Sequence, residues 1–127
     1  MRFLVDTHIL VWALADSPRL SPRARALLAD PQHEFWVSSA SVWELAIKVL
    51  RGKFALLGPL AGIEPVVTAA GFRSLPVTIR HAAAIESTTV AHGDPFDRLL
   101  LAQCEVETLR LLTADAQLSQ LPVAYAC

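Results

Sequence analysis

The sequence predicts an α/β domain with a mostly parallel sheet. Three observations support this fold class. Strand-like and helix-like stretches alternate along the whole chain, and the breaks between them are short and marked by proline or glycine. Parallel strands need crossover connections, which are usually helices, so this alternation favours a parallel sheet. The length of 127 residues is enough for one domain and too short for two.

The first half of the chain is expected to form two strands and three helices. Ser21 and Pro22 begin the second helix, because serine is a good N-cap and proline suits the first helical position. Gly52 stops the third helix. The expected elements are strands at 3–5 and 35–37 and helices at about 7–15, from 22 onward, and from 38–41 to about 51.

The second half is expected to form three strands, three helices and a short helical turn. Pro65 should kink or split the first of these helices, and Asp94-Pro95 opens the strongest one. The expected elements are a weak helix at 59–70, a strand at 73–77, a helix at 79–88, a loop around 92–93, a helix at 94–107, a strand at 109–112, a helical turn at 115–120 and a strand at 123–125.

The third helix is unusual because it is apolar on two sides. Hydrophobic residues make up 54% of the chain, which leaves a small domain with apolar surface for a partner. A surface helix normally has one apolar face, so this helix and the similarly apolar first helix are either buried in the core or face a partner. Both interpretations remain open. The two stripes of the third helix are Val42, Leu45, Ala46 and Val49, and Trp43, Ile47 and Leu50.

The composition argues against several classes of protein. The apolar runs are too short for a membrane span, and the start of the chain lacks a signal peptide, so we expect a cytoplasmic protein. Cys104 and Cys127 form neither a disulfide framework nor a zinc motif. The net charge is −1, so any contact with nucleic acid must come from a local basic patch.

Several acids fall where a catalytic site would need them. Asp6 follows the first strand, and Asp115 follows the strand at 109–112. Asp94 and Asp97 open a helix, and Glu44 is the only acid of an apolar helix. Ligands of an open parallel sheet bind beyond the carboxyl ends of its strands. Carboxylates gathered there would repel one another, and Mg²⁺ or Mn²⁺, which prefer hard oxygen ligands, would remove that penalty.

Each of these acids also has an ordinary structural interpretation. A carboxylate can cap a helix, close a turn or pair with a nearby lysine, and such roles are open to Asp6, Asp115 and Glu44. Asp94 is a clear N-cap, and we assign it that structural role. Asp97 can simply favour the positive end of its helix. The residue pattern alone therefore leaves a metal site and a set of caps as alternatives.

Longer motifs separate these alternatives. The chain contains F-L-V-D-T-H at 3–8, V-S-S-A-S-V-W-E-L-A-I-K at 37–48, H-G-D-P-F-D-R-L-L at 92–100 and L-L-T-A-D at 111–115. In this order and spacing they resemble the VapC-like PIN-domain toxins, in particular the branch with a D-P-F-D-R-L-L signature. The resemblance implies a three-layer α/β/α sandwich forming a single PIN domain over 1–127. It also implies cleavage of RNA that depends on Mg²⁺ or Mn²⁺.

The resemblance also assigns roles to individual residues. Thr7 and Ser38 match small hydroxyls that flank the site, and Arg98 matches an arginine that contacts phosphate or tethers a carboxylate. The chain departs from many relatives at Ala91, where the first of two histidines is expected and only His92 remains. The catalytic, metal-binding acids that the resemblance implies are Asp6, Glu44, Asp97 and Asp115.

The expected function is that of a metal-dependent endoribonuclease, the toxin of a toxin–antitoxin pair. The resemblance implies a homodimer and a cognate antitoxin. The alternative is a catalytically silent PIN domain that binds protein or RNA. A phosphatase of the haloacid-dehalogenase type would need a second aspartate at His8, and no glycine-rich nucleotide loop occurs. The candidate phosphate contacts are Lys48, Arg51, Lys53, Arg80 and Arg98.

Overall fold

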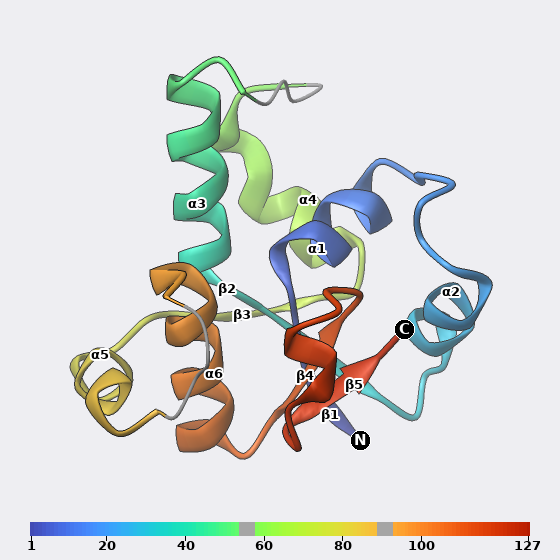
Figure 1. Ribbon diagram of the computed structural model, residues 1–127. Helices are drawn as coiled ribbons and strands as arrows, with labels where there is room; N and C mark the ends of the chain where they lie inside the picture. Colours follow the sequence, from blue (N-terminus) through green and yellow to red (C-terminus); the bar gives the residue numbers. More distant parts are fainter. Residues whose placement is uncertain (54–57, 89–92) are drawn as a thin grey trace.

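The sheet of the computed structural model, which describes residues 1–53, 58–88 and 93–127, has five strands. All neighbouring strands pair in parallel, in the order β3-β2-β1-β4-β5, which confirms the predicted fold class (Figure 1). The strands are β1 (Arg2–Val5), β2 (Glu34–Ser38), β3 (Arg73–Leu75), β4 (Arg110–Thr113) and β5 (Ala124–Ala126).

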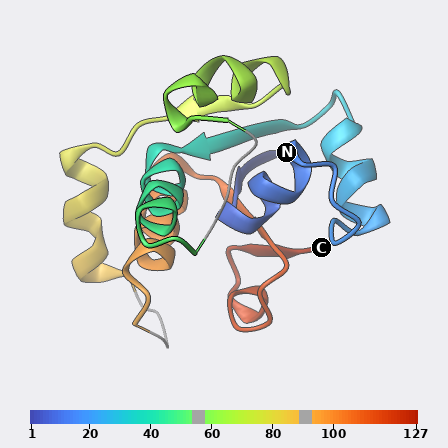
Figure 2. The same ribbon diagram turned by 90° about the horizontal axis from the view of Figure 1, so that it is seen from above.

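Helices cover both faces of the sheet, which confirms the expected three-layer sandwich (Figure 2). Side chains alternate between the faces, so Phe3 and Val5 pack with α1, α2 and α4, while Leu4 packs with α6 on the other side. The α-helices of the described residues are α1 (Thr7–Leu14), α2 (Pro22–Ala29), α3 (Ser39–Leu50), α4 (Ile63–Ala69), α5 (Ile79–Ala84) and α6 (Pro95–Glu107). Short 3₁₀ turns are η1 (Leu60–Gly62), η2 (Ile85–Ser87) and η3 (Leu118–Gln120).

Helix α3 stands at the carboxyl edge of the sheet and contacts both α1 and α6 (Figures 1 and 2). Leu45 belongs to the core on one face and Ala40 to the core on the other. The distal end of the helix extends beyond the sheet, and both Trp43, nearer its start, and Leu50, at its end, are exposed. Burial therefore explains only part of its second apolar stripe.

Most predicted boundaries agree with the structure to within a few residues. The helix predicted over 59–70 is split, but the break falls at Gly62, before Pro65. Pro65 lies in the first turn of α4, where the missing N–H would have no partner in the helix. The loop predicted around 92–93 falls partly outside the described residues. No helix in the described ranges is long and apolar enough to cross a membrane.

Candidate active site

The site lies where the strand order changes direction. Chain connections run from β1 to β2 and β3 on one side, and β4 and β5 lie on the other side of β1. In open parallel sheets, a crevice forms beyond the carboxyl ends of the strands at such a point. Asp6 directly follows β1, and Asp115 comes two residues after the end of β4. The topology therefore brings these two acids to one edge, as predicted.

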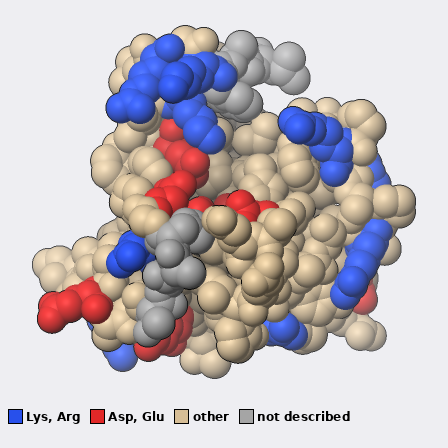
Figure 3. Space-filling model, viewed as in Figure 1, with Lys and Arg blue, Asp and Glu red and all other residues tan. Residues whose placement is uncertain are grey.

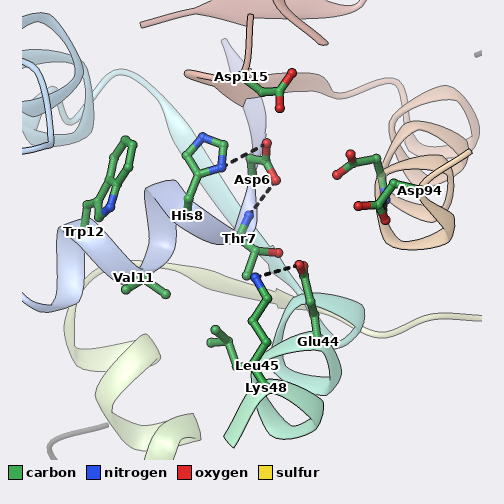
Figure 4. Close-up of a pocket in the computed structure, with 11 residues that line it drawn as sticks. Asp6, Thr7, His8, Val11, Trp12, Glu44, Leu45, Lys48, Asp94 and Asp115 are labelled. Atoms are coloured by element: carbon green, nitrogen blue, oxygen red, sulfur yellow. Dashed lines mark hydrogen bonds and ion pairs between the residues drawn. The ribbon is translucent and has the colours of Figure 1, made fainter. Parts of the chain in front are cut away.

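A pocket of about 310 Å³ opens at this edge (Figure 4). Five carboxylates from four segments of the chain contribute to its wall, together with two aromatic rings and one lysine. All four predicted acids line it. The lining residues are Asp6, Thr7, His8, Val11, Trp12, Glu44, Leu45, Lys48, Asp94, Asp97 and Asp115.

Asp6 is held by two hydrogen bonds and by a contact with His8. Its residue is only 4% exposed, and its Oδ1 accepts a hydrogen bond from the Thr7 N–H at 2.8 Å. Its Oδ2 accepts a hydrogen bond from the Thr113 hydroxyl at 2.7 Å and lies 3.5 Å from His8 Nδ1. Asp6 is also the N-cap of α1, so the structural role and the place in the pocket belong to the same side chain.

Glu44 reaches the pocket from α3. The Thr7 hydroxyl donates a hydrogen bond to Ser41 Oγ at 2.9 Å, and this buried contact fixes the start of α1 against the first turn of α3. Glu44 follows Ser41 on that helix and pairs with Lys48 at 3.2 Å, four residues later. The predicted ion pair is therefore present, and it lies inside the pocket (Figure 4).

The remaining acids come from the first turn of α6 and from the loop after β4. Asp94 caps α6, with Oδ1 accepting from the N–H groups of Phe96 and Asp97 at 2.9 and 3.3 Å. Asp115 caps the turn that leads into η3, with Oδ1 accepting from Gln117 N–H at 2.8 Å. Each cap uses one carboxylate oxygen, so the second oxygen is left for other contacts.

The acids perturb one another's protonation. The pKa of Asp97 is raised to about 7, first by burial and then by the negative charges of Asp6, Asp94, Glu44 and Asp115. Burial also raises the pKa of Asp6, against the opposing effect of its contacts. Carboxylates that share a site without enough positive charge show this behaviour.

The donor set suits a hard divalent cation. In the described part of the chain, no three His, Cys, Asp or Glu side chains are already gathered tightly enough to hold a metal ion. The carboxylates nevertheless face one space, and Mg²⁺ is usually held by one or two carboxylates together with several waters. The residues therefore fit such an ion held partly through water, and a cation would offset the repulsion that raises the pKa of Asp97.

Two of the residues assigned by resemblance do not line the pocket. Ser38 is fully buried, and its hydroxyl accepts a hydrogen bond from Ala40 N–H at 3.0 Å, so it caps α3. Arg98 is partly buried in the first turn of α6. His92 lies outside the described residues. Thr7 contacts the proposed acidic set directly, because its N–H donates a hydrogen bond to Asp6.

Sequence analysis missed two contributors to the site. Asp94 was assigned to capping alone, although it stands three residues before Asp97 and therefore shares the same helical turn. Thr113 is fully buried and joins Asp6 to the backbone N–H of Asp115, which donates to its hydroxyl at 3.0 Å. His8, two residues after Asp6, also contacts that carboxylate, with its Nδ1 3.5 Å from Oδ2.

Basic residues gather above the acidic hollow. Figure 3 shows Lys and Arg side chains over the upper end of α3, and acidic side chains in the depression beneath them. Lys48, Arg51 and Lys53 are all exposed at this end of the helix, and Lys48 lines the pocket. Arg80, on α5, belongs to another part of the surface. The local basic patch that a nearly neutral chain would need is therefore present.

The fold is similar to several solved structures. For VapBC2 from Rickettsia felis bound to a DNA fragment from their promoter, the TM-score is 0.66 at 15% identity, over 100% of this chain and 98% of the other. For a toxin–antitoxin complex from Klebsiella pneumoniae, the TM-score is 0.63 at 17% identity, over 98% of this chain and 99% of the other. For FitAcB from Neisseria gonorrhoeae, the TM-score is 0.59 at 21% identity, over 92% of this chain and 89% of the other. At these identities the likeness establishes the fold alone.

A comparison with curated proteins gives no match. The family model of the PIN domain, in contrast, matches residues 3–124, which is nearly the whole chain. All five acids of the pocket lie within this range: Asp6, Glu44, Asp94, Asp97 and Asp115. The matched range also contains all four motifs on which the resemblance rested. The chain therefore belongs to the PIN domain family.

Proposed function

We propose that this protein is a metal-dependent endoribonuclease and the toxin of a toxin–antitoxin pair. The observation that carries the proposal is the pocket at the carboxyl edge, where five carboxylates from four segments share one space with a single lysine among the described lining residues. Such crowding destabilises the protein unless a cation binds there. Membership of the PIN domain family supports the nuclease assignment.

The residues of the pocket have distinct roles in this proposal. Asp6, Glu44 and Asp97 hold Mg²⁺ or Mn²⁺, directly or through water, and Asp115 supports them. The bound ion would supply an activated water and would stabilise the leaving oxygen of a phosphodiester. The expected products carry 5′-phosphate and 3′-hydroxyl ends, because the bond between phosphorus and the 3′ oxygen is the one that breaks.

The surface around the pocket fits a single RNA strand. Lys48, Arg51 and Lys53 form a basic end of α3 beside the hollow, and these side chains can contact phosphates on either side of the cleaved bond (Figure 3). The pocket is open to the surface, which suits a splayed strand or loop better than a duplex. Arg98, at the start of α6, is a further candidate for a phosphate contact or a carboxylate tether.

The proposed partners are an antitoxin and a second copy of the chain. Three apolar side chains of α3 are exposed: Trp43 at 59%, Val49 at 38% and Leu50 at 87%. Such a surface is unfavourable in water and favours a protein partner. Structurally similar chains occur in toxin–antitoxin complexes. An antitoxin bound to this face of α3 would lie beside the acidic pocket. We place the protein in the cytoplasm, where its proposed RNA substrate is found.

The test is cleavage of a fluorescent single-stranded RNA by purified Asp6→Asn protein with Mg²⁺ or Mn²⁺. Asparagine keeps the acceptor for the Thr7 N–H but removes the charge, so cleavage should fall by at least about 100-fold while the fold persists. Asp16→Asn is the matched control. Asp16 is exposed and pairs with Arg25, and its φ of 49° is one that asparagine tolerates well.

The outcomes separate the proposal from its rival. Cleavage by wild type and by Asp16→Asn, but not by Asp6→Asn, supports a nuclease that uses this pocket. Equal cleavage by all three proteins would contradict the proposed site. If wild type cleaves no RNA with either metal and calorimetry detects no Mn²⁺ binding, the silent binding module is the better description.

A further inference from the structure

The imidazole of His8 bridges two parts of the proposed metal site. Its Nδ1 lies 3.5 Å from Asp6 Oδ2, and its Nε2 accepts a hydrogen bond from the Ala114 N–H at 3.2 Å. Ala114 immediately precedes Asp115 in the loop after β4. In Figure 4 the ring stands beside Asp6, and Asp115 lies above that carboxylate in the view. One side chain of α1 therefore contacts one acid directly and the backbone next to another.

These contacts define the proton position on the neutral ring. A backbone N–H can only donate, so the Nε2 that faces Ala114 must carry a lone pair. In the neutral imidazole the proton then resides on Nδ1, which faces Asp6. His8 consequently accepts a hydrogen bond from the loop at Nε2 and presents its Nδ1–H to Asp6 Oδ2 at 3.5 Å.

The ring is also held in place by packing. Trp12 lies four residues later on α1, with its ring centroid 4.9 Å from that of His8 and the two planes tilted by 52°. The guanidinium of Arg19 lies 5.5 Å from the centroid of the Trp12 ring. This stack leaves the side chain of His8 31% exposed and supports the orientation in which its nitrogens meet Asp6 and Ala114.

The contacts of Asp6 leave limited room for a cation. An ionised carboxylate offers about four acceptor positions. Among the described residues, the Thr7 N–H donates a hydrogen bond to Oδ1 and the Thr113 hydroxyl donates one to Oδ2, which His8 Nδ1 also contacts. About one position therefore remains, which suits a single coordination bond from Asp6. Groups that orient a metal ligand in this way usually change metal affinity by about 10- to 100-fold when they are removed.

We propose that His8 is a positioning residue, which fixes the carboxylate of Asp6 and the backbone next to Asp115 relative to each other so that both acids serve the same cation. The inference rests on the proposed function, since it assumes that the pocket binds a divalent metal. Neither the PIN domain assignment nor the four acids alone require it, because His8 belongs to neither the acidic set nor the flanking hydroxyls.

Three substitutions separate the two contacts. Asparagine places its amide near the position of Nδ1, so His8→Asn can keep the donor toward Asp6. Glutamine reaches the position of Nε2, so His8→Gln can keep the acceptor for the Ala114 N–H. His8→Ala keeps neither. The measurement is Mn²⁺ affinity of each purified protein by calorimetry, together with its unfolding temperature without metal and its kcat and KM for RNA.

We expect His8→Ala to weaken Mn²⁺ binding by about tenfold or more. The Asn and Gln variants should each recover part of this loss, and kcat should fall while KM for RNA changes little. Wild-type Mn²⁺ affinity in His8→Ala would overturn the inference. It would also be overturned if all three variants lost affinity only in proportion to a lower unfolding temperature.

A reference variant distinguishes the inference from the proposed function. Asp6→Asn defines the affinity that remains when a proposed ligand is lost. If wild type binds Mn²⁺ and Asp6→Asn does not, the pocket is a metal site, and the His8 variants then decide the positioning role alone. If wild type itself binds no Mn²⁺, the proposed function is contradicted and the inference falls with it.

Discussion

The two edges of the sheet differ in whether their acidic side chains are paired with basic ones. At the amino edge, Glu34 lies 3.7 Å from Arg2 and 3.3 Å from Arg73, and both guanidiniums also lie over the Trp36 ring, at 5.9 and 5.7 Å. One acid there has two cations. At the carboxyl edge, five acids line a pocket in which Lys48 is the one basic side chain among the described lining residues.

This difference agrees with the proposal that the carboxyl edge binds a cation, whereas the acid at the amino edge is neutralised within the fold. Pairing an acid with arginine, as Glu34 is paired, removes like-charge repulsion at no loss of stability. The carboxyl edge instead raises the pKa of Asp97 to about 7, mainly through burial and then through its acidic neighbours. A protein retains such a destabilising arrangement where a function requires it. Changes at the two edges should therefore have opposite effects on stability.

The largest effect on stability should come from adding a divalent cation to the carboxyl edge. Mn²⁺ at about 100 times its Kd should stabilise the wild-type protein by about 2.7 kcal/mol, which corresponds to a Tm increase of roughly 8 °C. The increase should be larger at pH 8 than at pH 6, because Asp97, with a pKa of about 7, must lose its proton to bind metal. Differential scanning fluorimetry measures both shifts. An equal increase for Asp6→Asn would place the ion elsewhere.

A smaller effect on stability should appear without metal, when one negative charge of the pocket is removed. The folded-state pKa of Asp97 is raised from 3.8 to about 7, so the folded protein holds a proton that the unfolded chain releases. This contribution to stability is complete below pH 3.8 and is lost as the pH rises through 7. Asp97→Asn removes the dependence.

Urea denaturation at pH 5 and pH 8 measures this effect. Between pH 5 and pH 8, the free energy of unfolding of Asp97→Asn should rise by about 1 kcal/mol relative to that of wild type. This figure is reduced for solvent screening because Asp97 is partly exposed. Groups that titrate elsewhere, such as the histidines, cancel in the comparison. A difference between the two proteins that stays constant with pH would show that Asp97 carries no excess proton.

The fold could be predicted because its signals are local. Ser21 with Pro22, and Asp94 with Pro95, mark helix starts that the structure shows as capped, with the prolines in the first turn. Asp6 could be placed at the edge of the sheet because parallel strands end together. Exposure of α3 could not be predicted, because its two apolar stripes are equally consistent with a core helix and with one that extends beyond the sheet.

The contacts inside the site were less predictable than its acids. Asp6 and Thr113 are 107 positions apart, and their 2.7 Å hydrogen bond depends on side-chain orientation across two strands, β1 and β4. The place of Asp94 in the pocket could not be predicted from its role as a cap, because the two roles are compatible: both capping hydrogen bonds engage Oδ1. Ser38 shows the reverse case, since its hydroxyl is engaged in capping α3.

The smallest effect should come from the amino edge. Glu34→Gln removes the charge that joins Arg2 and Arg73 while keeping the size of the side chain, so stability should fall by about 0.5 kcal/mol, as for other exposed pairs. The loss should shrink at high salt, which already screens the pair. Mn²⁺ binding and RNA cleavage should be unchanged, because no residue of this cluster lines the pocket. Urea midpoints at low and high salt measure the change. If Glu34→Gln were instead stabilising, the acids at the two edges would share the same electrostatic strain, and crowding at the carboxyl edge would no longer point to a ligand.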